Sequence, residues 1–167
     1  MIPLHRAAAA TLAWLGCGSA ETTRDFASLN AEVREIVRGS CGSGAAPCHG
    51  PNPTARSLDF ERLLESDTLW EAMADVQSCE YDTLPLVAPG EPERSWLMVK
   101  LTGQTDPDGR LRFDPDSSWV PAPDSCAVGV RGSYDFGTRM PEVGQLSPRE
   151  IETFRAWILA GPPPTAQ

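Results

Sequence analysis

Two thiols and an imidazole stand close together in the first third of the sequence, at Cys41, Cys48 and His49. Covalent attachment of haem requires two thiols, which add to the vinyl groups, and a histidine directly after the second thiol, which binds the iron. Cys48-His49 meets the second requirement. Six residues separate the cysteines instead of the usual two. Because residues 42–47 are small and loop closure entropy grows slowly with length, this spacing does not prevent attachment.

Met140 is the candidate second ligand of the iron. It lies in an irregular segment close to glycines, where a side chain can be directed at a metal, whereas Met73 and Met98 lie in apolar helical stretches and are expected in the core. His5 falls in an expected signal peptide, so His49 is the sole histidine of the processed chain. Thioether ligation raises the reduction potential of haem iron, which suits an electron carrier. Without haem, Met140 is better explained as a turn residue that covers the core.

The cysteines also permit an interpretation without haem. In an oxidising compartment Cys41 and Cys48 can form a disulfide, and His49 is then an ordinary polar residue. Cys79 and Cys126 lie outside the motif, and we expect them to pair and fix a long loop to the body of the domain. Such a bond contributes roughly 2–4 kcal/mol. A structural zinc site is disfavoured because the cysteines lack paired ligand spacing.

A helix is expected to lead the chain to the first cysteine of the motif. Its apolar residues recur at helical spacing: Phe26, Leu29, Val33, Ile36 and Val37. Asn30 is the expected N-cap, and the helix is expected to stop at Gly39-Ser40. Cys41 therefore follows the end of a short amphipathic helix.

A second amphipathic helix is expected near the end of the sequence. Residues 147–150 form a capping box with proline at the first helical position. The apolar stripe that follows consists of Ile151, Phe154, Trp157 and Ile158. Gly161 and three prolines end the helix. We expect Phe154 and Trp157 in the core.

The middle of the chain is expected to contain short elements. Apolar spacing predicts a short helix or turn over 58–64 and helices over 69–76 and 93–101, with a rigid turn over 87–92 before the last. Residues 102–138 show no periodicity and hold many Gly, Pro, Asp and Ser residues together with several aromatic ones. A loop of this length is functional or an insertion, and its aromatic residues predict that it packs onto the rest of the domain.

The N-terminus has the features of an export signal. Residues 1–16 contain an apolar run that is too short to span a bilayer, and Gly16 precedes Cys17 as at a bacterial lipoprotein cleavage site. Trp14 departs from that pattern, in which an aliphatic residue is usual; the alternative is an ordinary secretory signal. We expect lipidation of Cys17, a polar tether over 17–28, and a lipid-anchored protein in the periplasm or on the outer membrane.

Composition limits the class of protein. The 167 residues suffice for one domain with a hydrophobic core. Sixteen prolines and 14 glycines predict short helices with long irregular connections. A net charge of −9 argues against nucleic acid and anionic lipid as ligands, so contact with a membrane is expected only through the N-terminal lipid.

Several sequence pieces occur in an order that resembles the c-type cytochrome domains of multidomain proteins and lipoproteins of environmental bacteria. They are Cys48-His49-Gly50, Pro89-Gly90-Glu91-Pro92 with Ser95, Leu97 and Lys100-Leu101, then Arg139-Met140-Pro141, Leu146-Ser147 and Trp157-Ile158 before Gly161. The resemblance covers residues 29–161, with an insertion over about 104–136, and leaves 162–167 as a proline-rich tail. It implies a mainly α, cytochrome c-like fold whose C-terminal helix packs across the first helix. It also implies that His49 and Met140 are the two axial ligands.

These observations favour an electron-transfer domain that carries haem c, bound through Cys41 and Cys48, and that meets an unidentified redox partner protein. No pair of nucleophile and base suggests an enzyme. The alternative is a haem-free, disulfide-stabilised surface domain with a structural or binding role and a cytochrome c-like frame. A weaker third hypothesis is a haem-based sensor or a subunit of a larger oxidoreductase.

Overall fold

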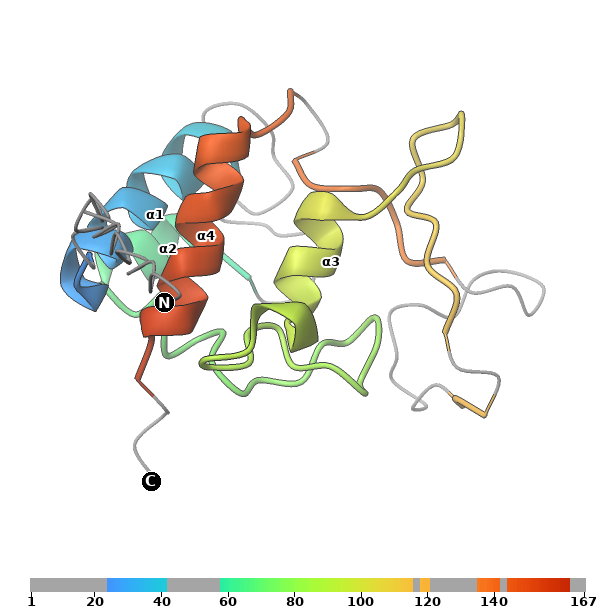
Figure 1. Ribbon diagram of the computed structural model, residues 1–167, viewed down its shortest axis with the longest axis horizontal. Coiled ribbons are helices and arrows are strands. Elements are labelled where there is room, and N and C mark those ends of the chain that lie inside the picture. Colours follow the sequence, from blue (N-terminus) through green and yellow to red (C-terminus); the bar gives the residue numbers. More distant parts are fainter. Residues whose placement is uncertain (1–23, 42–57, 116–117, 121–134, 142–143, 163–167) are drawn as a thin grey trace, which may run out of the picture.

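Helices supply the regular structure. The computed structural model describes residues 24–41, 58–115, 118–120, 135–141 and 144–162, and Figure 1 shows their course. In chain order the helices are α1 (Phe26–Ser40), α2 (Phe60–Glu65), the 3-10 helix η2 (Pro92–Arg94), α3 (Trp96–Thr102) and α4 (Pro148–Ala160). Extended pairing within these ranges is limited to isolated β-bridges. The prediction of a mainly α fold with few short helices is confirmed for the described part of the chain.

Helix α1 delivers the chain to Cys41, as predicted, but its cap was assigned to the wrong residue. Asp25 is the N-cap, and its side chain accepts a hydrogen bond from the Ser28 N–H at 2.8 Å. Asn30 lies inside the helix, where its Oδ1 accepts a hydrogen bond from the Trp157 indole N–H at 3.0 Å. The helix begins at Phe26, so the last residues of the expected tether are helical.

Helix α4 forms as the capping box predicts. Ser147 Oγ accepts a hydrogen bond from the Glu150 N–H at 3.3 Å, and Glu150 Oε2 accepts one from the Ser147 N–H at 2.7 Å. Phe154, Trp157 and Ile158 are buried. The capping box thus provides hydrogen-bond partners for the N–H groups of Ser147 and Glu150. The apolar stripe of the helix packs against the other helices.

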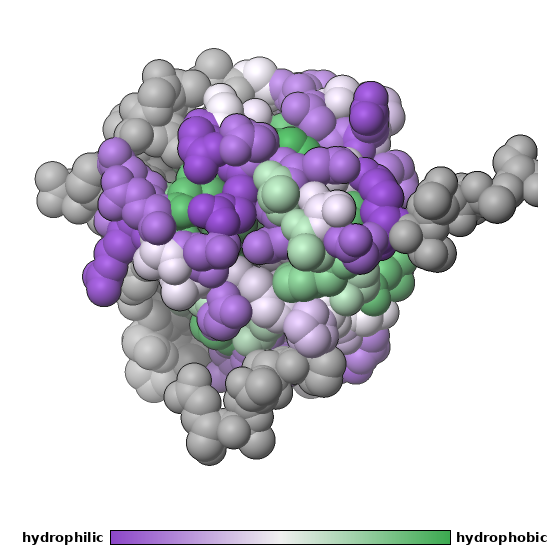
Figure 2. Space-filling view, turned by 90° about the vertical axis from the view of Figure 1, so that its left-hand side faces the viewer, coloured by the Kyte–Doolittle hydropathy of each residue, from purple (hydrophilic) through white to green (hydrophobic). Residues whose placement is uncertain are grey.

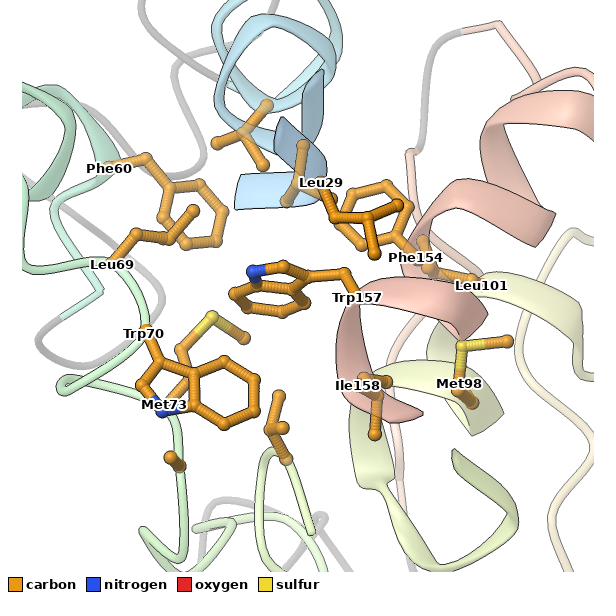
Figure 3. Packing of buried hydrophobic residues seen from close by; sticks show 14 of the residues in the cluster. Leu29, Phe60, Leu69, Trp70, Met73, Met98, Leu101, Phe154, Trp157 and Ile158 are labelled. Atoms are coloured by element: carbon orange, nitrogen blue, oxygen red, sulfur yellow. The ribbon is translucent and has the colours of Figure 1, made fainter. Parts of the chain in front are cut away.

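Helices α1 and α4 pack against each other around a first core cluster (Figure 1). Its buried members are Leu29, Val33, Val37, Phe60, Leu64, Leu69, Trp70, Met73, Ala74, Val87, Met98, Leu101, Phe154, Trp157 and Ile158. Trp157 lies among the side chains labelled in Figure 3 and meets Trp70 edge to face at a ring distance of 4.8 Å. The expectation that the C-terminal helix packs on the first helix is confirmed.

The surface over α1 and α2 is largely polar, with smaller apolar areas, in the view of Figure 2. On α4, Leu159 is 57% exposed although its neighbour Ile158 is fully buried. Single exposed leucines are common on protein surfaces. The contrast within α4 shows how sharply the amphipathic pattern divides core from solvent.

The helix expected over 69–76 does not form. One turn is present, in which the Ala74 N–H donates to Trp70 O at 2.8 Å. Asp75 then takes a left-handed conformation with φ of 56°, and its N–H donates to Val87 O at 2.9 Å. The hydrogen bond to Val87 replaces the bond that Asp75 would make within a helix. The helix prediction for residues 69–76 was therefore wrong.

The helix expected over 93–101 forms as two pieces, η2 and α3, separated at Ser95. Ser95 is fully buried. Its Oγ accepts a hydrogen bond from the Ala88 N–H at 2.9 Å and donates to Glu91 O at 3.1 Å. The hydroxyl therefore ties the preceding turn to the start of α3 and holds Ser95 in the extended conformation that interrupts the helix.

The expected insertion over 104–136 packs onto the body of the domain through aromatic rings, as predicted, in the part that is described. The second core cluster has Tyr81, Trp96, Leu111 and Phe136 as buried members, with Leu84, Leu86, Val99, Phe113 and Trp119 packed against them. The Trp96 and Phe113 rings meet at 5.0 Å, nearly perpendicular. Trp119 donates its indole N–H to Asp82 Oδ1 at 2.6 Å. These contacts fix the loop against the segment before α3.

Candidate functional site

The structure locates part of the predicted site. Among the predicted site residues, those within the described ranges are Cys41, Cys79 and Met140. Those outside them are Cys17, Cys48, His49 and Cys126. One thiol of the proposed attachment motif and the proposed methionine ligand can therefore be placed in the fold.

Cys41 caps the C-terminal end of α1. Its backbone N–H donates to Val37 O at 2.9 Å, which closes the last turn of the helix. The residue is partly buried and packs against the first core cluster. Its thiol is free in this structure. Cys48 lies outside the described residues, so the alternative disulfide between Cys41 and Cys48 stays a prediction.

The environment of Cys41 suppresses thiolate formation. Burial raises the pKa of the Cys41 thiol to about 11. The thiol is therefore protonated at neutral pH, and a protonated thiol is a poor nucleophile. In the folded chain the Cys41 thiol is therefore a weakly reactive group that packs against the first core cluster.

Met140 lies at the border of the same core. It is partly buried and packs against the first core cluster, to which Cys41 also packs. Its backbone N–H donates to Lys100 O, in α3, at 2.8 Å. Met73 and Met98 are 3% exposed, which confirms both as core residues. Of these three methionines, Met140 alone combines an irregular backbone with partial exposure.

Residues 135–141, called here the Met140 segment, pass between α3 and the loop that follows it. The Leu111 N–H donates to Gly137 O at 2.8 Å, and Arg110 forms a β-bridge with Thr138. Gly137 has a φ of 67°, a left-handed conformation that favours glycine. The path of the chain toward Met140 is thus fixed by main-chain bonds on both sides.

An ion pair between a buried lysine and a partly exposed glutamate lies beside the Met140 segment and was not predicted from the sequence. Lys100 is the single lysine among the 14 lysine and arginine residues, and its side chain is 8% exposed. Its Nζ donates to Glu80 Oε1 at 3.2 Å and to Phe136 O at 2.6 Å. Trp96 donates its indole N–H to Glu80 Oε2 at 2.7 Å. The available signal was a lone lysine in an otherwise apolar helix.

Cys79 is disulfide-bonded. Its partner lies outside the described residues, so pairing with Cys126 stays a prediction. Cys79 directly precedes Glu80, and the disulfide therefore constrains the chain next to the ion pair of Lys100 and Glu80. A covalent bond at this position limits the motion of the loop that supplies the carboxylate.

The described ranges show neither a metal-binding cluster nor a membrane-spanning helix. They hold no cluster of three or more His, Cys, Asp or Glu side chains arranged to bind a metal ion. Nor do they include a helix with the length and apolarity required to cross a bilayer. Comparison with known proteins found no matching family model, no matching curated protein and no matching solved structure.

Proposed function

We propose that this chain is a haem-binding electron-transfer domain of an exported, lipid-anchored protein. The observation that carries the proposal is the position of Cys41 and Met140. They lie far apart in the sequence, yet both pack at the border of the first core cluster. A thiol and a thioether that both border an apolar core are chemically suited to a group that is apolar, held covalently and bound through iron.

Of the residues that would hold such a group, Cys41 and Met140 lie within the described ranges, and their chemistry fits it. Cys41 and Cys48 would hold it through thioether bonds, and His49 and Met140 would bind its iron. When bound, haem supplies an iron that cycles between the ferrous and ferric states. The chain itself contributes a backbone held by main-chain hydrogen bonds at Cys41 and Met140, and an apolar core against which both side chains pack.

Export and lipidation are supported by the sequence and by one feature of the fold. Residues 1–16 have the pattern of a signal peptide that ends before Cys17. The disulfide at Cys79 suits an oxidising compartment, where structural disulfides persist. The same disulfide also supports the alternative of a haem-free surface domain with a structural or binding role.

The proposal is tested by maturation of the full chain together with the machinery that attaches haem to c-type cytochromes. We expect a haem-stained band that survives denaturing electrophoresis. The variant with both Cys41→Ala and Cys48→Ala should lose it. The variant with both Cys79→Ala and Cys126→Ala is the matched control, because it removes two cysteines outside the motif, of which Cys79 is disulfide-bonded, and should keep the stain. A colourless wild-type chain, or equal staining of both variants, would contradict the proposal.

A further inference from the structure

Lys100 occupies a position that is unusual for a lysine. The chain places arginine at its other cationic positions and one lysine in the interior. That lysine lies in α3 and faces Glu80, which is also held by the Trp96 indole. Removing a charged group from water is unfavourable unless partners satisfy it. The ammonium group of Lys100 meets this requirement through Glu80 Oε1 and Phe136 O.

The contacts of Lys100 converge on the Met140 segment. Its side-chain Nζ donates to Phe136 O at 2.6 Å, and its backbone carbonyl accepts a hydrogen bond from the Met140 N–H at 2.8 Å. One residue thus holds both ends of the stretch from Phe136 to Met140. The side-chain bond depends on the ammonium group, and the ammonium group is in turn held by Glu80.

We propose that Lys100, fixed by Glu80, is the positioning residue that keeps Met140 in place as a ligand of haem iron. This inference rests on the proposed function, because it assigns a role to Lys100 in that same site. A neutral thioether is a weak ligand, and it binds iron only if the backbone that carries it is held near the metal. Releasing Phe136 O from its donor frees one end of this backbone.

The first test uses Lys100→Met in the haem-loaded full chain. Methionine keeps the length and volume of the side chain and removes the donor. We expect weakening of the near-infrared charge-transfer band between methionine sulfur and ferric iron, and a reduction potential shifted toward that of Met140→Ala. Arg155→Met is the matched control, because it removes a cation whose ion pair joins α4 to Glu93, just before α3, and does not touch the Met140 segment. This control should leave the band and the potential unchanged.

A second variant guards against loss of folding in Lys100→Met. Glu80→Gln keeps a side chain that can accept the Trp96 bond but removes the negative charge that holds the ammonium group. We expect the same changes of spectrum and potential, with smaller amplitude. In both variants the Met140 amide should also exchange with solvent about tenfold faster than in the wild type, since one hydrogen-bond anchor of the segment is weakened.

The outcomes separate the two proposals. A coloured wild-type protein that shows methionine ligation, with an unchanged band and potential in Lys100→Met and Glu80→Gln, overturns the role of Lys100 and leaves the proposed function intact. A wild-type chain without haem overturns the proposed function and with it the ligand role of Met140. Faster Met140 exchange with unchanged ligation shows that Lys100 holds the segment without positioning a ligand, and also overturns the inference.

Discussion

The two core clusters of this domain are built differently, although they share α3. The first joins the apolar faces of α1, α2, α3 and α4, together with buried residues of the irregular segment 69–87. The second joins loop segments to Trp96 through a group of aromatic rings and has no helical periodicity. The helices form because of local sequence patterns. The second cluster instead depends on contacts between large side chains that are far apart in the sequence. The Met140 segment touches both, because Phe136 belongs to the second cluster and Met140 packs on the first.

The largest effect is expected at the centre of the first cluster. Trp157 is fully buried, and its truncation in Trp157→Ala should lower the free energy of unfolding by about 3–5 kcal/mol. Leu159→Ala on the same helix is the control, because its side chain is 57% exposed and should matter by less than about 0.5 kcal/mol. Denaturant unfolding of both variants measures the difference. Equal effects would show that α4 does not pack as described.

A smaller and more local effect is expected in the second cluster. Phe136→Ala should cost about 3 kcal/mol, because Phe136 is 3% exposed and its ring meets several others. We expect amide exchange to become faster over residues 105–113 and 135–141, with little change in α1 and α4. Exchange measured residue by residue separates the clusters. Uniform acceleration throughout the chain would show that the two clusters unfold as one unit.

Loss of the capping box should have a moderate effect that is confined to the first cluster. Ser147→Ala removes the oxygen that accepts the Glu150 N–H, and should cost about 1 kcal/mol. Thermal unfolding measures this cost, and Ser147→Asp should recover most of it because aspartate is also a good N-cap. A value near zero for Ser147→Ala would mean that tertiary packing alone fixes the start of α4.

An effect confined to alkaline pH is expected for the chain without haem. The Cys41 thiol has a pKa of about 11 in the fold, against 9.0 for the ordinary thiol. The unfolded chain therefore releases the proton first, and stability should fall as pH rises from about 9 toward 11. Cys41→Ser should reduce this slope, because the hydroxyl does not titrate there. An unchanged slope in Cys41→Ser would place the titration elsewhere.

The helical frame could be predicted because its signals are local. The start of α4 is predicted by a motif of four residues that contains Ser147, Pro148 and Glu150. The buried face of α1 is predicted by the spacing of its apolar residues. The failure over 69–76 has a long-range cause, since Asp75 bonds to Val87 instead of continuing a helix. The interruption at Ser95 likewise depends on a hydroxyl that bonds outside its own helix.

Only those residues of the candidate site that belong to a sequence motif could be predicted. The cysteine segment and Met140 could be identified from spacing and neighbouring residues, and the structure adds that Cys41 and Met140 border one core. The pairing of Lys100 with Glu80 could not be derived, because residues that stand 20 positions apart in the sequence give no periodic signal of contact. Only the rarity of lysine in this chain pointed to a special position.

The decisive measurement is mass spectrometry of the matured, purified chain, read at the peptide that contains Cys41, Cys48 and His49. The proposed function predicts that this peptide carries one haem, bound through both thiols, and that the intact chain has the corresponding absorbance. A peptide with two unmodified thiols, or with two hydrogens missing because of a disulfide, would contradict it. The chain would then be a disulfide-stabilised helical domain without a bound redox group.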